Sequence, residues 1–301
     1  MLNKIIMHIN YAELPGKPLG GRSIDEICEF AVRCGYDGIE FRGKVPEVLG
    51  RISFRQYAEL IAKGKANHGL SEVLFRFDLP ECTDEDEEKR AAAIEEIIKK
   101  AKIAKDVCDT KLCNTTAKKY FSPIKSAPAD DYAFHGSAVV SEREWRLTAD
   151  AYSQVGKALE KIGVKFAFET HMGYIHDLPE TSKHLVDIID SPAVGINMDY
   201  GNTVYFSGVP SVEEAIDIYG KKLFYVHMKN SIRVPGDYRR IPTALSDGEI
   251  NHRTYLSKLL SSGFCGPIGI EAPRSGDRLL YANQDLEYLK SVIESINGGF
   301  R

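Results

Sequence analysis

Large apolar residues alternate with small or polar ones along residues 164–169, VKFAFE. Val164, Phe166 and Phe168 occupy one set of alternate positions, and Glu169 ends the other set. Because a period of two is that of a β-strand, the pattern predicts a strand with one apolar face and one face that ends in a carboxylate. In a closed parallel barrel the apolar face packs against helices, and the carboxylate points inward at the mouth.

The same alternation returns in residues 193–199 (AVGINMD), 223–229 (LFYVHMK) and 267–271 (PIGIE). Each of these predicted strands also carries a side chain able to bind a metal on its inward face, near its C-terminal end. The C-terminal ends of parallel barrel strands lie at one mouth, where barrel enzymes carry their active sites. We therefore expect four side chains to meet there: Glu169, Asp199, His227 and Glu271.

The whole chain can be read as strands that alternate with helices. The expected strands are residues 4–10, 36–43, 71–77, 110–118, 164–169, 193–199, 223–229 and 267–271. The expected helices are residues 23–34, 53–68, 84–109, 141–161, 178–189, 212–219, 252–262 and 283–296. Ser23 and Ser141 stand at N-cap positions, and Glu144 completes a capping box with Ser141. Eight such pairs predict an α/β fold, a single (β/α)8 TIM barrel that spans residues 1–301.

One connection is much longer than the others. Residues 118–140, after the fourth strand, contain two prolines and the rings of Tyr120, Phe121, Tyr132 and Phe134. A long insertion after a barrel strand lies at the mouth, so this extended loop is expected to cover the substrate or to contact a second subunit. The alternative is a structural loop that packs on its own aromatic rings.

Composition excludes several classes of protein. The chain has 301 residues, a net charge of −4 and no basic cluster, which argues against a nucleic-acid partner. No apolar run approaches the roughly 20 residues that cross a bilayer, and the first residues lack the apolar core of a signal peptide. We therefore expect a cytoplasmic protein with no membrane partner. The six cysteines form no C-x-x-C pair, so we expect them to be reduced and structural.

Three carboxylates and one imidazole form a donor set for a divalent ion, with Mn²⁺ favoured and Co²⁺, Mg²⁺ or Zn²⁺ as alternatives. Such an ion keeps open positions for two substrate oxygens, and a hydroxyketone offers a suitable pair. The ion would stabilise the enediolate that forms when a base removes the intervening proton. Glu169 and Glu271 are the expected base and acid. Taken singly, each strand-end acid is more often a helix cap or a salt-bridge partner.

Other inward-facing residues are also candidates. His171 lies two residues beyond Glu169, and we expect it to transfer a proton rather than bind the metal. His8 is either a substrate contact or a hydrogen-bonded core histidine. Glu40 is a candidate substrate contact, although it could instead pair with Arg42 and line the barrel.

Several motifs resemble those of the xylose isomerase-like TIM barrels, a family of sugar isomerases, epimerases and dehydratases. The motifs are GYDGIEF, FETHMGYIHD, MDYGN, VHMKN and the segment from Leu245 to Glu271. The resemblance implies that Glu169, Asp199, His227 and Glu271 bind the metal, and that Arg233, six residues after His227, contacts substrate. The ketose epimerases of the family carry a histidine where this chain has Asn202, which is then a substrate-side residue.

The resemblance and the residues together imply a metal-dependent isomerase or epimerase that acts on a sugar or polyol ketone. A lyase is the main alternative, because the spacing of Glu169 and His171 is similar to that in dehydratases and C-glycoside deglycosidase catalytic subunits. An abasic-site endonuclease shares this barrel but needs further histidines and a basic groove. A non-catalytic barrel that binds a sugar or a partner subunit is a third alternative, which a metal-binding assay would distinguish. We expect a carbohydrate substrate without phosphate, and either a homo-oligomer or a hetero-oligomer with a small accessory subunit.

Overall fold

The computed structural model describes residues 3–121, 128, 130–236, 239–271 and 274–299. Within these residues, eight parallel strands close into a barrel in the order β1-β10-β7-β6-β5-β4-β3-β2. They are β1 (Ile5–His8), β2 (Gly38–Arg42), β3 (Glu72–Arg76), β4 (Leu112–Thr115), β5 (Lys165–Glu169), β6 (Val194–Asp199), β7 (Leu223–Met228) and β10 (Ile268–Ile270). The predicted (β/α)8 barrel is therefore confirmed.

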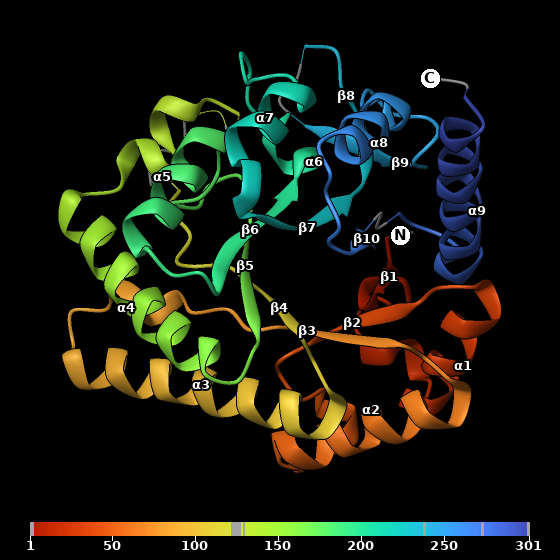
Figure 1. Cartoon of the computed structure of the whole chain (residues 1–301), viewed down its shortest axis with the longest axis horizontal. Coiled ribbons are helices and arrows are strands. Elements are labelled where there is room, and N and C mark those ends of the chain that lie inside the picture. The colour runs from red at the N-terminus through yellow and green to blue at the C-terminus, as the bar shows by residue number, and fades with distance from the viewer. Residues whose placement is uncertain (1–2, 122–127, 129, 237–238, 272–273, 300–301) are drawn as a thin grey trace.

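Helices surround the strands in a ring, as Figure 1 shows. They are α1 (Ile24–Cys34), α2 (Phe54–His68), α3 (Glu87–Cys108), α4 (Glu142–Glu160), α5 (Pro179–Ile189), α7 (Val212–Tyr219), α8 (His252–Ser261) and α9 (Arg278–Asn297), with the short α6 (Tyr200–Thr203) after β6. Short 3-10 helices lie at Ile9–Tyr11, Pro18–Gly21, Glu47–Leu49, Pro80–Thr83, Tyr132–Phe134, Gly136–Val139 and Gly220–Lys222. In the described part of the chain, no helix is both long enough and apolar enough to cross a membrane.

Capping boxes fix the start of several helices. The side chains of Ser23 and Ser141 each accept a hydrogen bond from the backbone N–H three residues later, and the N3 glutamate accepts one back from the serine N–H. Both predicted caps are confirmed. The last helix was expected to begin at residue 283, but α9 begins at Arg278 because Asp277 caps it by accepting from the N–H of Leu280 at 3.1 Å.

Alternate residues along the barrel strands belong to two separate hydrophobic cores, one outside the barrel and one inside it. A large cluster between strands and helices contains Phe166 and Phe168 of β5 and their counterparts on the other strands. A small cluster inside the barrel consists of Ile6, Leu74, Leu112, Ala167 and Tyr225. The predicted alternation is therefore confirmed, and residues two positions beyond the inner cluster along a strand, such as Glu169 after Ala167, point into the barrel.

A short hairpin follows β7 and was not expected from the sequence. Strands β8 (Asn230–Arg233) and β9 (Arg240–Thr243) pair antiparallel and form a separate two-stranded sheet. Ile232 and Ile241 on it are 44% and 59% exposed. Because the hairpin has little buried face, its sequence lacks the strong apolar alternation that marks the barrel strands.

Two isolated β-bridges hold the described parts of the long connection between β4 and α4. Lys119 bridges to Tyr174, and Phe121 bridges to His135, whereas residues 122–127 and 129 lie outside the described part. The Tyr120 ring is buried, and the Tyr132 ring packs edge-on against Phe206 at 5.6 Å. Phe121 and Phe134 remain 41% and 40% exposed. The segment thus packs partly on its own chain and reaches the loop that follows β6.

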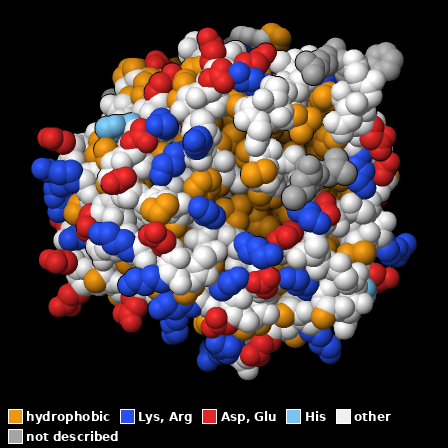
Figure 2. Space-filling view, viewed as in Figure 1, with side chains coloured by type: hydrophobic (Ala, Val, Ile, Leu, Met, Phe, Trp, Pro, Cys, Tyr) orange, Lys and Arg blue, Asp and Glu red, His pale blue; other side chains and the backbone are white. Residues whose placement is uncertain are grey.

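Charge is mixed on the face shown in Figure 2, which has the orientation of Figure 1. Lys and Arg side chains are interspersed with Asp and Glu, and hydrophobic side chains line a hollow near the centre of this face. Nucleic-acid binding requires basic side chains gathered into a patch or stripe. The described surface of this face has no such concentration.

Candidate metal centre

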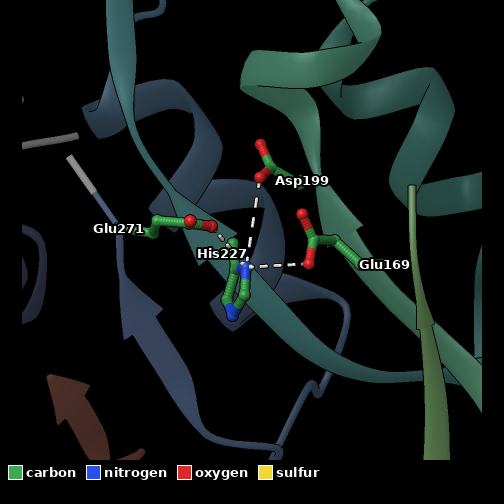
Figure 3. A group of neighbouring side chains, drawn as sticks. All are labelled: Glu169, Asp199, His227 and Glu271. Carbon is green, nitrogen blue, oxygen red and sulfur yellow. Dashed lines mark ion pairs between the residues drawn. The ribbon is translucent and has the colours of Figure 1, made fainter. Parts of the chain in front are cut away.

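The four predicted ligands meet at the C-terminal end of the barrel. Glu169 and Asp199 end β5 and β6, His227 lies near the end of β7, and Glu271 follows β10 directly. One possible ligand atom from each lies within 4.8 Å of every other (Figure 3). Ligand atoms about 2.0–2.3 Å from one ion are at most about 4.6 Å apart, so a small closure would complete the shell.

The register between β6 and β7 brings two of these residues together. The pairing shifts between Ile196 and Asn197, and Asp199 then lies opposite His227. Gly269 on β10 gives the imidazole room, because a Cβ there would lie 2.8 Å from Cδ2 of His227 and 2.3 Å from the hydroxyl of Tyr225. A side chain at residue 269 would therefore displace His227.

The two ring nitrogens of His227 have different surroundings. Nε2 is 2.8 Å from Oε2 of Glu40. Nδ1 is 3.1 Å from Oε2 of Glu271, 3.9 Å from Oε2 of Glu169 and 4.0 Å from Oδ2 of Asp199. The Glu40 contact thus turns Nδ1 toward the three carboxylates, as a carboxylate behind a metal-binding histidine does.

Three buried atoms aimed at this centre have no hydrogen bond to any residue that the structure describes: Asp199 Oδ2, His227 Nδ1 and Glu271 Oε2. Buried polar atoms are rarely left in this state, and a group of them calls for an explanation. Oxygen and imidazole donors together suit a divalent ion. The residues present therefore fit a metal, and these four are the ones that could hold it.

The charges in the centre shift the ionisation of its members. Burial would lower the pKa of His227, but the Glu40 and Glu271 carboxylates raise it well above its ordinary value. Burial raises the pKa of Asp199 to about 7, an effect that Lys229 opposes and Glu169 and Glu271 reinforce. A metal ion would replace the proton on His227 and keep Asp199 ionised.

Two cations at the centre were missed by the sequence analysis. Arg76 Nη1 lies 2.7 Å from Oε2 of Glu169; although burial opposes this, Arg76 helps hold the pKa of Glu169 at about 2. Lys229 Nζ lies 2.7 Å from Oδ2 of Asp199 and 4.0 Å from Oε2 of Glu271. Both lie two residues beyond an inward-facing residue, Leu74 and His227, so strand parity could have found them.

Glu40 lies behind His227, with both its oxygens engaged by protein groups. Oε2 accepts from the hydroxyl of Tyr225 at 2.8 Å and faces Nε2 of His227, while Oε1 accepts from Nδ2 of Asn114 at 2.9 Å. Arg42 does not take part, because it pairs with Glu13 at 2.9 Å. A substrate contact by Glu40 remains a prediction, and the observed contacts make Glu40 a support for His227.

The side chain of Asn114 was also missed, and it ties the centre together. Its Nδ2 donates to Oε1 of Glu40 at 2.9 Å and to Oε2 of Glu169 at 3.1 Å. Its Oδ1 accepts from Nδ2 of Asn197 at 3.1 Å. One amide on β4 thereby connects Glu40 of β2 and Asn197 of β6 to the predicted ligand Glu169 of β5.

His171 keeps one ring nitrogen available. Its Nδ1 lies 3.0 Å from the carbonyl oxygen of Met172, so this nitrogen carries the hydrogen and donates it. Burial lowers the pKa of His171, and Glu169 partly offsets this. The ring is therefore neutral at physiological pH, and among the described residues no hydrogen-bond partner is found for Nε2, which can act as an acceptor.

His8 lies beside the centre, with Nδ1 3.8 Å from Oε1 of Glu271. That nitrogen accepts from the backbone N–H of Asn10 at 3.2 Å, and the side chain of Asn10 donates to Glu271 at 3.3 Å. Burial lowers the pKa of His8. These contacts match the hydrogen-bonded core histidine, and the substrate contact stays a prediction.

Asn202 and Arg233 have protein partners in this structure. Asn202 Nδ2 donates to the carbonyl of Thr170 at 3.0 Å and to Oε1 of Glu169 at 3.4 Å. Arg233 pairs with Asp130 at 2.7 Å and donates to the carbonyl of Tyr205 at 2.9 Å. Asn202 therefore orients a predicted ligand, and Arg233 joins three loops at the mouth. Their roles toward substrate remain predictions.

A sequence model of the xylose isomerase-like TIM barrel family matches residues 28–292. Among curated proteins, inosose dehydratase of Clostridium beijerinckii is 27% identical over 95 residues, which cover 32% of this chain and 31% of the relative. Inosose dehydratase of Geobacillus kaustophilus is 23% identical over 173 residues, which cover 52% of this chain and 56% of the relative. The chain thus spans about half, or less, of the length of these relatives.

Solved structures share the fold over nearly the whole chain. A xylose isomerase-like TIM barrel protein from Mycobacterium smegmatis, in complex with magnesium, has a TM-score of 0.74 and 18% identity, with 97% of each chain covered. The 3-keto-D-glucoside 4-epimerase YcjR from E. coli has a TM-score of 0.71 and 15% identity, with 96% of this chain and 100% of that chain covered. At such identities the likeness establishes the fold alone.

We predict that Glu40→Gln weakens Mn²⁺ binding by about 10- to 100-fold, the usual effect of removing the group behind a metal-binding histidine. A glutamine has only one accepting oxygen. If that oxygen accepts from Tyr225 and His227, the glutamine NH2 group faces the Nδ2 donor of Asn114, and two donors then oppose each other. Isothermal titration of the metal-free protein measures the change. Tyr225→Phe is the matched control, since it removes one donor to the same oxygen and leaves the imidazole contact. Equal affinities for Glu40→Gln and the wild type would contradict the role of Glu40.

We also predict that Mn²⁺ uptake releases protons and weakens as the pH falls. The pKa of His227 is raised and that of Asp199 is about 7, so both groups hold protons below neutral pH in the metal-free protein. The ion needs both deprotonated, so its affinity is greatest above about pH 7 and declines below it. Titration at about pH 6 and about pH 8, in buffers of different ionisation enthalpy, should show more protons released at the lower pH. An affinity that does not change with pH would refute this assignment.

Proposed function

The chain belongs to the xylose isomerase-like TIM barrel family, and from that premise we propose that it is a metal-dependent enzyme acting on a hydroxyketone of a sugar or cyclic polyol. The observation that carries this proposal is the convergence of Glu169, Asp199, His227 and Glu271, three of which aim at one point a buried atom that has no hydrogen bond to a described residue. A divalent ion held there would polarise the substrate carbonyl and stabilise the negative charge that develops when the neighbouring carbon loses a proton.

Among the reactions that begin with this proton transfer, we favour elimination of water. Several relatives found by sequence are inosose dehydratases, and another is a 3-dehydroshikimate dehydratase. Asn202 stands where the ketose epimerases that this chain resembles have a histidine. The class of substrate would then be a cyclic polyol ketone such as an inosose. For the resident ion we propose Mn²⁺, with Mg²⁺, Co²⁺ and Zn²⁺ as alternatives.

In this reaction His171 would move the proton. Its free Nε2 accepts the proton from the carbon next to the carbonyl, the electrons of that C–H bond form a carbon–carbon double bond, and the neighbouring C–O bond breaks. The departing hydroxyl takes the proton back from Nε2 and leaves as water, so the imidazole returns to its neutral state. The Met172 carbonyl keeps the Nδ1 hydrogen in place and thereby orients Nε2 for both transfers.

Epimerisation is the second candidate, favoured by a specific arrangement. Glu169 and Glu271 approach the centre from opposite sides in Figure 3, as two groups must when one removes a proton and the other returns it on the other face. A product one water lighter than the substrate distinguishes elimination. An isomeric product that gains solvent deuterium distinguishes epimerisation.

We further propose that the protein is cytoplasmic and forms a homo-oligomer or binds a small accessory subunit. The exposed rings of Phe121 and Phe134 support this assembly, because such rings often lie at interfaces. Light scattering measures the molar mass of two preparations, the protein purified by itself and the protein captured from its own cells with any bound subunit. The first tests the homo-oligomer and the second the accessory subunit. A monomer in both preparations would refute it.

We predict that removal of the metal, or Glu271→Gln, lowers turnover by at least about 100-fold. The assay uses a panel of inososes, ketoses and 3-keto-glycosides with Mn²⁺, followed by mass spectrometry of the product. Added Mn²⁺ should restore the chelated wild type. The control is Glu59→Gln, an exposed glutamate on α2. Full turnover after verified removal of every metal would refute the proposed function.

We predict that His171→Asn lowers turnover by roughly 100-fold or more, the usual size of a general acid–base contribution, and leaves the Mn²⁺ stoichiometry unchanged. His184→Asn on α5 is the matched control, because His184 is exposed and contacts Trp145. Loss of metal from His171→Asn would identify a ligand instead. Full activity would identify a structural residue. Either result contradicts the proton-transfer role.

A further inference from the structure

Lys229 lies beside two of the predicted metal ligands, although it is not one of them. It follows β7 directly and lies two residues after His227, so it shares the inward face of that histidine. Its Nζ is 2.7 Å from Oδ2 of Asp199 and 4.0 Å from Oε2 of Glu271. These are two of the oxygens that lack a hydrogen bond of acceptable geometry to any described residue. The ammonium group therefore lies against the atoms that an ion would use.

The fold reserves space for this side chain. A Cβ on Gly201, in α6, would lie 2.5 Å from Cγ and 3.2 Å from Cε of Lys229. Gly201 is not among the glycines with positive φ, so its backbone does not require glycine. The absence of a side chain at residue 201 instead leaves room for the stem of Lys229, which indicates that the position of this lysine is built into the fold.

The charges explain why a lysine is needed there. Glu169, Asp199 and Glu271 lie close together, and Arg76 contacts only Glu169 among them. Lys229 supplies the nearest positive charge for Asp199, and it shares Glu271 with His227, whose Nδ1 lies 3.1 Å from Oε2 of that carboxylate. Without Lys229, the repulsion of Asp199 by the other carboxylates in a buried site would be poorly compensated unless a metal were bound.

An ammonium group and a divalent ion that both contact Oδ2 of Asp199 repel each other in a buried site, so binding of the ion would favour withdrawal of Lys229 from that oxygen. The side chain of Lys229 is 20% exposed, compared with 0% for Asp199. It therefore has a route toward the mouth, whereas the carboxylate is fixed by the barrel.

We propose that Lys229 is a built-in counter-cation of this centre: it pairs with Asp199 and lies near Glu271 in the metal-free protein, gives way to a divalent ion, and then donates a hydrogen bond to a substrate oxygen at the mouth. This inference rests on the proposed metal-dependent function. It adds that Lys229 competes with the divalent ion for Asp199, and that the displaced ammonium group then binds a substrate oxygen.

The test measures Mn²⁺ affinity without substrate, by electron paramagnetic resonance of free Mn²⁺ during titration of the metal-free protein. Lys229→Met and Lys229→Gln should bind Mn²⁺ at least about 10-fold more tightly than the wild type, because the ion no longer displaces a cation. In thermal melts, both variants should unfold at a lower temperature than the wild type without metal, and should gain more from added Mn²⁺. Turnover should nevertheless fall by at least about 10-fold, the loss of a donor to the reacting oxygens.

Lys222→Met is the matched control. Lys222 precedes the same strand and donates to the carbonyl of Ser191 at 2.9 Å, far from the mouth, so its removal should leave Mn²⁺ affinity unchanged. Wild-type or weaker affinity in both Lys229 variants would overturn the counter-cation, even if metal dependence stands. So would failure of both variants to fold with saturating Mn²⁺, because the ion should replace the missing charge. A wild type that binds no divalent ion would instead refute the proposed function.

Discussion

The structure around the mouth depends on one constraint: four carboxylates are buried, or nearly so, at one end of a single barrel. Glu40, Glu169 and Asp199 are at most 1% exposed, and Glu271 is 13% exposed. Carboxylates in such a place must be paired, protonated or bound to a cation. Arg76 pairs with Glu169, Lys229 pairs with Asp199 and lies near Glu271, and His227 lies between Glu40 and Glu271. A divalent ion, with His227 neutral, would bring the four carboxylates and the two remaining cations to zero net charge.

The barrel meets this constraint through strand parity. Because alternate residues face inward, each strand delivers its last inward side chain to the same level, and the apolar residues between them form the outer core. The shift in pairing between β6 and β7 sets Asp199 opposite His227, and Gly269 leaves room for the imidazole. The positions of the ligands are thus fixed by the backbone, and their charges by groups on neighbouring strands such as Arg76 and Asn114.

The sequence could predict the ligand positions, which the backbone of each strand fixes, but not the contacts that neighbouring strands supply. Glu169, Asp199, His227 and Glu271 were found because a polar residue at the end of an apolar alternation is conspicuous, and the barrel followed from eight such strands. Arg76 and Lys229 obey the same parity, but a basic residue at a strand end is usually read as a solvated one. The contact of Glu40 with His227 joins β2 to β7, which are not neighbours in the barrel, so no local pattern contains it. The β8–β9 hairpin has little buried face and hence no clear alternation.

Under the proposed function, the choice of substrate would depend on a different part of the molecule from the chemistry. The groups that would hold an ion or move a proton lie on strands or directly after them, whereas the mouth is bounded by the loops after β4, β6 and β7. Arg233 joins all three through Asp130 and the carbonyls of Val204 and Tyr205, and the ring of Tyr132 packs against Phe206. Loops tolerate change because they contribute little to the core. Proteins that this chain resembles include a dehydratase and an epimerase. Under the proposed function, the contacts among these three loops would select the ketone that reaches His171.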